Sequence, residues 1–298
     1  MNLLLFGADG QVGFELRRSL TPLGNVTACT HADVDLADAG SIVECINRMK
    51  PDWIVNAAAY TAVDLAEDQA ERARAINADA LDVIGRTARS IGARVLHYST
   101  DYVFDGAEAT ARDESAPCAP IGVYGQTKLD GERALADSGA AHLILRTAWV
   151  YAARGRNFLK TMLRLGAERE VLRVVADQHG TPTSARLIAE SSALMVFSLR
   201  SAAVDDTRFG TYHLTAAGQT TWHGFADALI ASAHELGLLA RRPEVQAIST
   251  DDYPTRARRP QCSVLDTHKL ERTFGLHMPD WRLPMAQVLA ELKDRQNP

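Results

Sequence analysis

Short apolar runs divide the first half of the chain at regular intervals. Between these runs, apolar side chains recur every three or four residues, the spacing that is typical of amphipathic helices. The runs themselves predict five buried strands, at residues 2–6, 26–29, 52–56, 94–98 and 142–146. Because strand and helix alternate five times, the sequence predicts an α/β fold with a doubly wound parallel Rossmann sheet.

Beyond about residue 150 the alternation of strand and helix becomes looser. In this half, helices are predicted at 157–165, 222–238, 267–274 and 284–293, and strands at 171–176 and 210–214. We therefore expect an NAD(P)-binding Rossmann domain over residues 1–150. Residues 151–298 would form a smaller, mainly substrate-binding C-terminal region, with some segments returning to the sheet.

Two helices of the first half are bounded by proline and glycine. Residues 40–50 predict a helix that Pro51 ends. Residues 64–91 predict a long helical stretch in two pieces that meet near Asn77, with Gly92 following the last turn. Glycine, proline and acidic residues then predict a loop over 105–122, before the next helix begins.

The first strand leads into a glycine-rich turn, Gly7-Ala-Asp-Gly10-Gln-Val-Gly13, and then into a helix. Strand, glycine turn and helix in this order are typical of a dinucleotide-binding site. Gly7 would allow the tight turn, Gly10 would let the backbone approach a pyrophosphate, and Gly13 would let the helix pack close to the strand. Amides at the helix N-terminus favour the same anion, so the sequence predicts NADPH or NADH as cofactor.

The second strand ends without the acidic residue that often binds the ribose hydroxyls of NAD. Thr30 and His31 follow the strand, Asp33 and Asp35 come slightly later, and no arginine stands there to bind a 2′-phosphate. The preference between NADH and NADPH is therefore left open. Asp35 and Leu36 either lie against the adenine or belong to a helix cap or a solvated loop.

Tyr124 and Lys128 are four residues apart on a predicted helix, so their side chains share one face. A nearby ammonium group favours the phenolate and so lowers the pKa of a phenol. Such a pair can act as a general acid that gives a proton to an oxyanion as it forms. Ser99 and Thr100 leave the carboxyl end of the fourth strand, where a hydroxyl can bind a substrate carbonyl or form a turn or cap.

Composition narrows the classes of partner. The 298 residues carry a net charge of −5 and 46% hydrophobic residues, as a globular enzyme does. The sequence contains no basic stripe that would predict nucleic-acid binding. The apolar run at 3–6 is too short to span a membrane. The scattered cysteines fit reduced thiols in a cytoplasmic protein.

Three motifs together resemble the extended short-chain dehydrogenase/reductases. They are the glycine turn, Tyr98-Ser-Thr-Asp-Tyr-Val-Phe104 and Tyr124-x-x-x-Lys128. Within this superfamily the chain is similar to the dTDP-4-dehydrorhamnose reductases, nearly from end to end. The similarity includes 55–59, 146–151, 157–158, 177–178 and 257–260.

The resemblance implies reduction of the 4-keto group of dTDP-4-dehydro-L-rhamnose by NADPH or NADH, to make a precursor of cell-surface polysaccharide. Tyr124 would deliver the proton, and Thr100 would bind and orient the carbonyl oxygen. Lys128 would hold the nicotinamide ribose and lower the pKa of Tyr124. Further cofactor contacts are implied at Gln11, Val12, Asp35, Leu36, Ala59, Tyr60, Thr61 and Tyr98.

The resemblance also implies contacts to the sugar nucleotide, a small-molecule substrate, through Asp101 and Trp149. Arg258 and Arg259 are candidates to bind its diphosphate, because a guanidinium matches phosphate geometry. An aromatic residue of the core or of an interface is the alternative for Trp149, and a solvated basic loop is the alternative for the two arginines. Members of the family are described with Mg²⁺, and Glu15, Glu190 and Glu291 are the candidate ligands. No metal-ligand spacing supports such a site, and surface charges on helices explain the three acids more simply. A homodimer is left open.

Three other functions share parts of this pattern. A sugar-nucleotide 4,6-dehydratase would, by resemblance, have a glutamate after Asp101, where this chain has Tyr102. A nucleotide-sugar epimerase would share the tyrosine and lysine but would not consume cofactor. A non-catalytic regulatory subunit of the methionine adenosyltransferase type also resembles these reductases. The retained Thr100, Tyr124 and Lys128 favour an enzyme over such a subunit.

Overall fold

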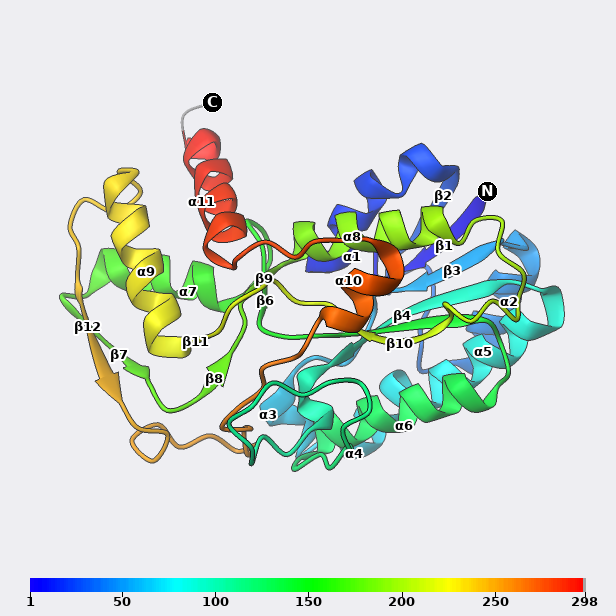
Figure 1. Cartoon of the computed structure of the whole chain (residues 1–298), viewed down its shortest axis with the longest axis horizontal. Helices are drawn as coiled ribbons and strands as arrows, with labels where there is room; N and C mark the ends of the chain where they lie inside the picture. Colours follow the sequence, from blue (N-terminus) through cyan, green and yellow to red (C-terminus); the bar gives the residue numbers. More distant parts are fainter. Residues whose placement is uncertain (297–298) are drawn as a thin grey trace.

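A parallel sheet forms the centre of the larger lobe, on the right in Figure 1. The computed structural model describes residues 1–296. Within them, six strands lie in the order β2-β1-β3-β4-β5-β10, and every neighbouring pair is parallel. In sequence order the six strands are β1 (Asn2–Phe6), β2 (Asn25–Cys29), β3 (Trp53–Asn56), β4 (Arg94–Thr100), β5 (His142–Thr147) and β10 (Gly210–His213). The predicted doubly wound α/β fold is confirmed.

Alternate residues of the central strands bury their side chains in two different cores. Leu3 and Leu5 belong to a core with α1 (Gln11–Ser19) and α8 (Ala185–Ser198). Leu4 and Phe6 point to the opposite core. That second face is covered by α2 (Ala39–Met49), α5 (Ala80–Ile91) and α6 (Val123–Asp137). A strand's side-chain period of two therefore places one helical layer on each face.

Helix α8 is absent from the sequence prediction, although it packs along α1 on the central sheet. Its buried face includes hydroxyl side chains as well as apolar ones, so its hydrophobic period is weak. Ser192, for example, donates a hydrogen bond to the carbonyl of Ile188 and accepts one from the hydroxyl of Tyr98, each of 2.7 Å. Ser184 caps the helix by accepting from the amide of Leu187.

The predicted helical stretch at 64–91 is divided differently from the expectation. It comprises α3 (Val63–Ala66), α4 (Ala70–Arg74), a π-helical turn (Ala75–Asp79) and α5. The break lies before α4, whereas Asn77 sits inside the π turn and the chain stays helical there. Such π turns are frequent at functional sites. Gly92 ends α5 with φ +73°, as predicted.

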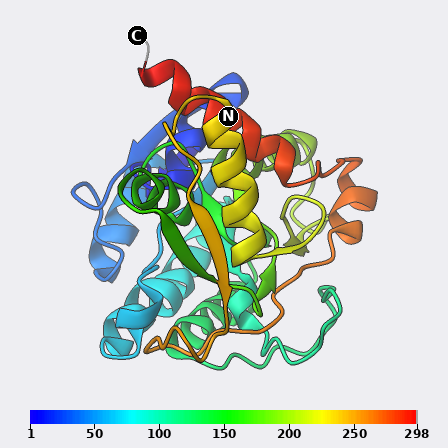
Figure 2. The ribbon, with the colours of Figure 1, turned by 90° about the vertical axis from the view of Figure 1, so that its left-hand side faces the viewer.

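The smaller lobe, seen from its own side in Figure 2, has a separate apolar core. It contains α7 (Phe158–Glu168), α9 (Trp222–Glu235) and α11 (Arg282–Gln296), near the predicted helices. The predicted strand β7 (Val171–Val175) pairs in parallel with an unpredicted strand, β12 (Glu244–Ile248). Short pairs join β6 (Val150–Tyr151) to β9 (Thr183–Ser184) and β8 (His179–Gly180) to β11 (Thr220–Thr221).

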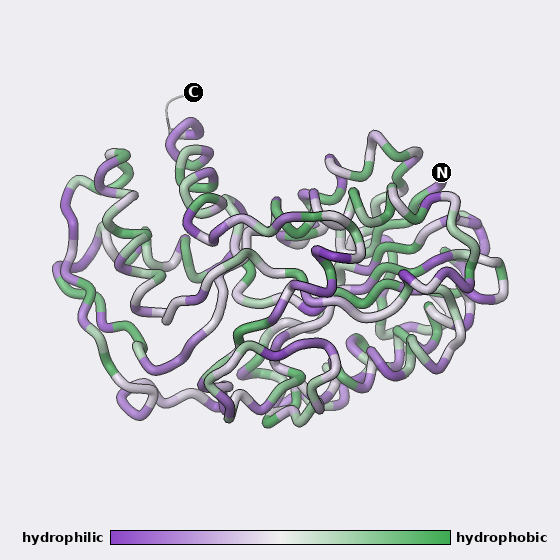
Figure 3. Tube along the Cα trace, in the orientation of Figure 1, coloured by the Kyte–Doolittle hydropathy of each residue, from purple (hydrophilic) through white to green (hydrophobic). Residues whose placement is uncertain are grey.

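Besides α8, two further segments of the C-terminal half return to the larger lobe. Strand β10 forms the edge of the central sheet, and α10 (His268–Phe274) packs beside it. Along the trace, hydrophobic stretches run through the central strands, while hydrophilic ones gather in outer loops and at helix ends (Figure 3). None of the helices in residues 1–296 combines the length and apolarity that crossing a bilayer requires.

Candidate active site

A pocket of about 870 Å³ opens at the carboxyl ends of the central strands. This is the edge at which open α/β sheets bind ligands. The strand order reverses between β1 and β3, so the loops after these two strands diverge around the pocket. The predicted residues that line it are Gly7, Gly10, Gln11, Val12, Asp35, Leu36, Ala59, Tyr60, Thr61, Tyr98, Thr100, Asp101, Tyr124, Lys128 and Trp149.

The glycine turn is built so closely that side chains would not fit at two positions. Gly7 has φ +76°, and a Cβ there would lie 2.6 Å from the backbone nitrogen of Ala58. A Cβ on Gly13 would lie 2.7 Å from the carbonyl carbon of Gly7, so only glycine at position 13 lets α1 pack this close to the turn. Gly10 is the N-cap residue of α1, and within the described residues no side-chain hydrogen bond caps this end of the helix. Its first amides are therefore available to an anion.

Lys128 is buried and turned toward strand β4. Its Nζ donates a 2.6 Å hydrogen bond to the carbonyl of Tyr98 and lies 3.0 Å from Nε2 of His97. The other ring nitrogen of His97 lies 3.2 Å from the amide of Asn56. Burial lowers the pKa of Lys128 to about 7, and the charge of Glu132 offsets only part of this effect. Burial and the neighbouring Lys128 hold the pKa of His97 well below its usual value.

Tyr124 lies one helical turn before Lys128, at the start of α6. Burial raises the pKa of Tyr124 to about 12, although the neighbouring hydroxyl of Thr100 lowers it and Asp101 raises it further. The expectation that Lys128 lowers this pKa is therefore wrong for this arrangement. The ammonium group is directed at Tyr98 and His97, and desolvation of the phenol dominates. Tyr124 keeps its proton at neutral pH, as a general acid must.

Thr100 is the last residue of β4, and Asp101 begins a short 3₁₀ turn after it. The hydroxyl of Thr100 donates to Oδ1 of Asp101 over 2.9 Å and accepts from the amide of Tyr102 over 3.2 Å. Burial raises the pKa of Asp101 to about 6, while hydrogen bonds from Ser263 and Thr100 lower it. Thr100 and Tyr124 therefore share one buried corner of the pocket with a carboxyl group of elevated pKa.

Ser99, the alternative hydroxyl from the sequence, serves a different purpose. It donates to Oε1 of Glu132, whose other oxygen pairs with Nη2 of Arg146 at 2.6 Å. All three side chains are buried. This ion pair ties β4, α6 and β5 together directly beneath the site, which leaves Thr100 as the hydroxyl available to a ligand.

The loop after β2 holds its two aspartates in local turns. Asp33 Oδ2 accepts from the amide and the hydroxyl of Thr30, each at 2.8 Å. Asp35 Oδ1 accepts from the amide of Ala37 at 2.9 Å, so a local turn describes it better than a helix cap. Thr30, His31 and Asp35 line the pocket. The rim where an adenosine ribose would lie thus presents one carboxylate, one imidazole and one hydroxyl.

The two late arginines are placed outside the pocket. Arg259 Nη2 donates to Asp64 over 2.8 Å, and Arg258 is exposed. Among the described residues, the arginines that line the pocket are Arg72 and Arg156, which the sequence analysis did not select. No motif marks either one, because both reach the pocket only through the packing of α4 and of the loop before α7.

Asn77 is a further residue that the sequence analysis did not assign to the site. Its side chain accepts from the amide of Tyr60 at 2.9 Å and donates to the carbonyl of Tyr60 and to Thr127, each at 3.2 Å. A Cβ on Gly131 would overlap the carbonyl oxygen of Asn77, so α6 packs close against the π turn. The fully buried Asn77 thereby fixes the loop after β3 to the helix that carries Tyr124.

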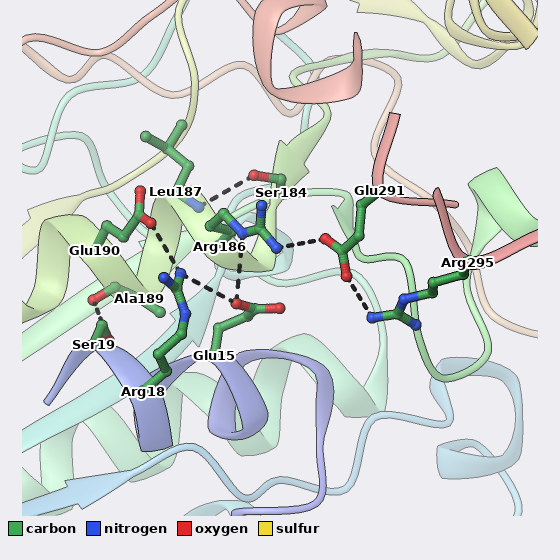
Figure 4. Close-up of polar contacts among 10 residues, drawn as sticks. All are labelled: Glu15, Arg18, Ser19, Ser184, Arg186, Leu187, Ala189, Glu190, Glu291 and Arg295. Atoms are coloured by element: carbon green, nitrogen blue, oxygen red, sulfur yellow. Dashed lines mark hydrogen bonds and ion pairs between the residues drawn. The ribbon is translucent and has the colours of Figure 1, made fainter. Parts of the chain in front are cut away.

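The three candidate metal ligands do lie in one region, but arginines occupy the space among them (Figure 4). Glu15 pairs with Arg18 and Arg186, Glu190 with Arg18, and Glu291 with Arg186 and Arg295. Within residues 1–296 no group of three or more His, Cys, Asp or Glu side chains could hold a metal ion. The donor set therefore does not fit Mg²⁺, and no chemical step is assigned to it.

Comparison with known proteins identifies the family of this chain. A family model described as the RmlD substrate binding domain matches residues 1–294. The chain belongs to the RmlD family. The dTDP-4-dehydrorhamnose reductase of Shigella flexneri is 46% identical over 296 residues, and the match covers 98% of each chain.

Solved structures from the RmlD family have the same fold. A dTDP-4-dehydrorhamnose reductase ortholog from Clostridium acetobutylicum has a TM-score of 0.89 at 34% identity, with 98% of this chain and 100% of that chain covered. One from Bacillus anthracis, in complex with NADP, has a TM-score of 0.88 at 31% identity, with 97% and 99% covered. The family indicated by the glycine turn and the Tyr-x-x-x-Lys pair is confirmed.

Proposed function

We propose that this chain is a dTDP-4-dehydrorhamnose reductase, an oxidoreductase that uses NADPH or NADH. It reduces the 4-keto group of dTDP-4-dehydro-L-rhamnose to give dTDP-L-rhamnose. One observation carries the proposal: the phenol of Tyr124 and the hydroxyl of Thr100 lie in the same pocket as the glycine turn. A hydrogen-bonding pair for a carbonyl therefore lies within reach of a dinucleotide site.

The residues of the glycine turn fit a dinucleotide. Gly7 and Gly13 leave no space for side chains, and the first turn of α1 has amides available to a pyrophosphate. Gln11 is fixed at this turn, because its Oε1 accepts a 2.8 Å hydrogen bond from Asn157. When bound, NADPH or NADH supplies the hydride that adds to C4 of the sugar.

Tyr124 delivers the proton to the C4 oxygen. With a pKa near 12 it is fully protonated at neutral pH, yet it can protonate an alkoxide, which is a much stronger base. Once its proton is released from Asp101, Thr100 would hold the same oxygen by a hydrogen bond and so orient the carbonyl toward Tyr124. Two hydroxyl donors would then converge on one oxygen.

Lys128 acts as the positioning cation for the nicotinamide ribose. Its buried Nζ has only the Tyr98 carbonyl and the neutral His97 as contacts in the described structure, which leaves a donor for ribose hydroxyls. Glu132, the acid whose charge raises the pKa of Lys128, is itself paired with Arg146. Ribose hydroxyls and cofactor phosphates would therefore favour the charged form of Lys128 after binding.

The sugar nucleotide occupies the part of the pocket between the strand ends and the smaller lobe. Trp149 and Asp101 line this part and would contact the sugar. Arg258 and Arg259 would need to turn inward from their present positions to reach a diphosphate, since Arg259 is paired with Asp64. Arg72 and Arg156 already line the pocket and are alternative partners for phosphate groups. A cytoplasmic location and a homodimer stay expectations from the sequence.

The deciding experiment measures NADPH and NADH oxidation by the purified chain with dTDP-4-dehydro-L-rhamnose, against buffer and against a UDP-linked 4-keto sugar. The reductase should consume one equivalent of cofactor per sugar and give dTDP-L-rhamnose, identified by NMR. Conversion of the sugar without net cofactor oxidation would indicate an epimerase instead. Cofactor binding with no turnover of any keto sugar would favour a regulatory subunit.

A further inference from the structure

Trp149 adopts a backbone conformation that bulky residues avoid. It follows β5 with φ +46°, and the only other non-glycine residue with positive φ among the described residues is Lys50. Such a conformation persists only where surrounding contacts impose it. The same residue lines the pocket together with Thr100 and Tyr124. The contacts that impose the conformation therefore also determine where one wall of the pocket lies.

The indole of Trp149 is stacked on the indole of Trp222. The ring centroids are 3.5 Å apart and the planes differ by 5°. Trp222 is the first residue of α9, where Thr221 caps the helix, and Phe158 packs on Trp222 with centroids 4.6 Å apart. Phe158 in turn packs on the fully buried Phe225. Trp222 is thus anchored in the core of the smaller lobe, whereas Trp149 belongs to the larger lobe.

Gly180 borders the edge of the same indole. A Cβ at this position would lie 2.6 Å from Nε1 of Trp149, so only glycine leaves room for the ring. Gly180 is held in β8, where it pairs with Thr220 of β11. Two residues after Thr220, the chain reaches Trp222. One short antiparallel pair of strands therefore supplies both the stacking partner and the space for the Trp149 side chain.

We propose that Trp222 and Gly180 are positioning residues that hold the indole of Trp149 as a fixed wall of the sugar subsite. Neither residue contacts the reacting atoms; each acts through Trp149. The inference rests on the proposed function for its kinetic consequence. Because Trp222 and Gly180 both come from the smaller lobe, that lobe sets the position of a side chain from the larger lobe. The shape of the sugar subsite then depends on how the two lobes are packed.

The stack can be observed without substrate. A crystal structure of the free wild type should show the two rings parallel and Trp149 in a single orientation. Trp222→Leu should leave the Trp149 ring in more than one orientation, and Gly180→Ala should displace it. Rings that are not stacked in the wild-type crystals would overturn the stack itself, whatever the enzyme reduces.

The kinetic test separates the two substrates. In Trp222→Leu and in Gly180→Ala, the KM for dTDP-4-dehydro-L-rhamnose should rise by about tenfold, the range that an aromatic contact can supply. The KM for NADPH should stay within about twofold, since the glycine turn and Lys128 are untouched. Trp222→Phe keeps an aromatic partner for Trp149 and should recover most of the sugar affinity.

Phe225→Leu provides the matched control. Phe225 lies in the same aromatic cluster and is fully buried, and its partners there include Phe158, Tyr151 and Trp281. This variant should lower the thermal midpoint while both KM values and the orientation of Trp149 stay near wild type. The proposal is overturned if Trp222→Leu loses the single orientation of Trp149 with an unchanged sugar KM, or if it matches Phe225→Leu in every kinetic parameter. Absence of keto-sugar reduction by the wild type would instead refute the proposed function, and the crystal structure would still test the stack.

Discussion

The hydroxyl of Thr100 donates a hydrogen bond of 2.9 Å to Oδ1 of Asp101. A hydroxyl has one proton, so while this bond exists Thr100 cannot also donate to a ketone oxygen. Protonation of Asp101 would reverse the bond and release the Thr100 proton for the substrate. With its pKa raised to about 6, Asp101 changes protonation state close to the conditions under which the enzyme works.

Asp101→Asn should therefore flatten the pH dependence of turnover. In the wild type, kcat/KM should fall as pH rises through about 6, because ionised Asp101 captures the Thr100 proton. The amide of asparagine can donate to Thr100 at every pH, so the variant should lack this step. Measuring kcat/KM from pH 5 to pH 8 for both proteins tests this. Parallel pH profiles of kcat/KM for the two proteins would show that Asp101 does not control the Thr100 proton.

The raised pKa of Asp101 also has a consequence for the stability of the fold. Its folded pKa of about 6 is above its ordinary value of 3.8, so between these two values the folded state holds more protons than the unfolded state. The free energy of unfolding should fall as pH rises from about 4 to about 6, by about 3 kcal/mol from this group alone. Urea unfolding of both proteins across that window should show the wild type losing about 3 kcal/mol relative to Asp101→Asn.

Tyr124→Phe removes the transferable proton but keeps the ring. Loss of a positioned general acid costs ~10²–10⁴-fold in rate, so kcat should fall by that amount. The Kd for NADPH should change little, because the glycine turn is unaffected. Stopped-flow measurement of cofactor oxidation would separate the two quantities. A variant with near-normal kcat would exclude Tyr124 as the acid.

Lys128→Met should weaken cofactor binding and alter its pH dependence. Burial lowers the pKa of Lys128 to about 7, so in the free enzyme the ammonium is present below that pH and lost above it. NADPH affinity in the wild type should therefore decline as pH rises through about 7. The variant, which has no charge to lose, should bind weakly at every pH.

Turnover gives a second measurement for Lys128. If Lys128 also lowers the pKa of Tyr124 once cofactor is bound, Lys128→Met should move the alkaline limb of the kcat profile to higher pH. A kcat profile identical in shape to that of the wild type, with only the cofactor Kd raised, would leave Lys128 as a ribose clamp alone. The structure of the free pocket favours this second outcome, because Nζ is directed at Tyr98 and His97.

The enzyme should discriminate only weakly between NADH and NADPH. Asp33 is engaged by Thr30, and the rim of the pocket offers His31 and Asp35 without an arginine beside them. We expect kcat/KM values within roughly tenfold of each other, a gap of about 1.4 kcal/mol. Both cofactors should be compared at saturating sugar nucleotide, with Asp35→Asn as a control. A preference of a hundredfold or more for NADH would mean that an aspartate recognises the ribose.

The parts of the site that could be predicted from sequence are those with short-range geometry. Strand, glycine turn and helix at Gly7 follow each other directly, and Tyr124 and Lys128 share a helical face because of their spacing alone. The end of the fourth strand marks both Ser99 and Thr100, because the carboxyl ends of a parallel sheet meet at one edge, and only the family resemblance selects Thr100.

The parts that were missed depend on contacts between distant segments. Asn77 joins the site because the π turn packs against α6, and no local pattern shows that packing. Helix α8 buries hydroxyl groups that receive partners only from other elements, as Ser192 does from Tyr98. The pKa of Tyr124 was predicted in the wrong direction because the sequence gives the distance to Lys128 along the helix but not the burial of the phenol.

Strand β10 has a practical consequence for anyone who cuts this chain. A fragment ending at residue 150 would contain the glycine turn, Thr100, Tyr124 and Lys128, yet it would lose the strand that pairs with β5. It would also lose α8, which covers one face of the sheet. The unpaired backbone of β5 and the uncovered apolar face would make the fragment prone to self-association. Residues 1–150 would therefore not fold as an independent piece, although they carry most of the residues that line the pocket.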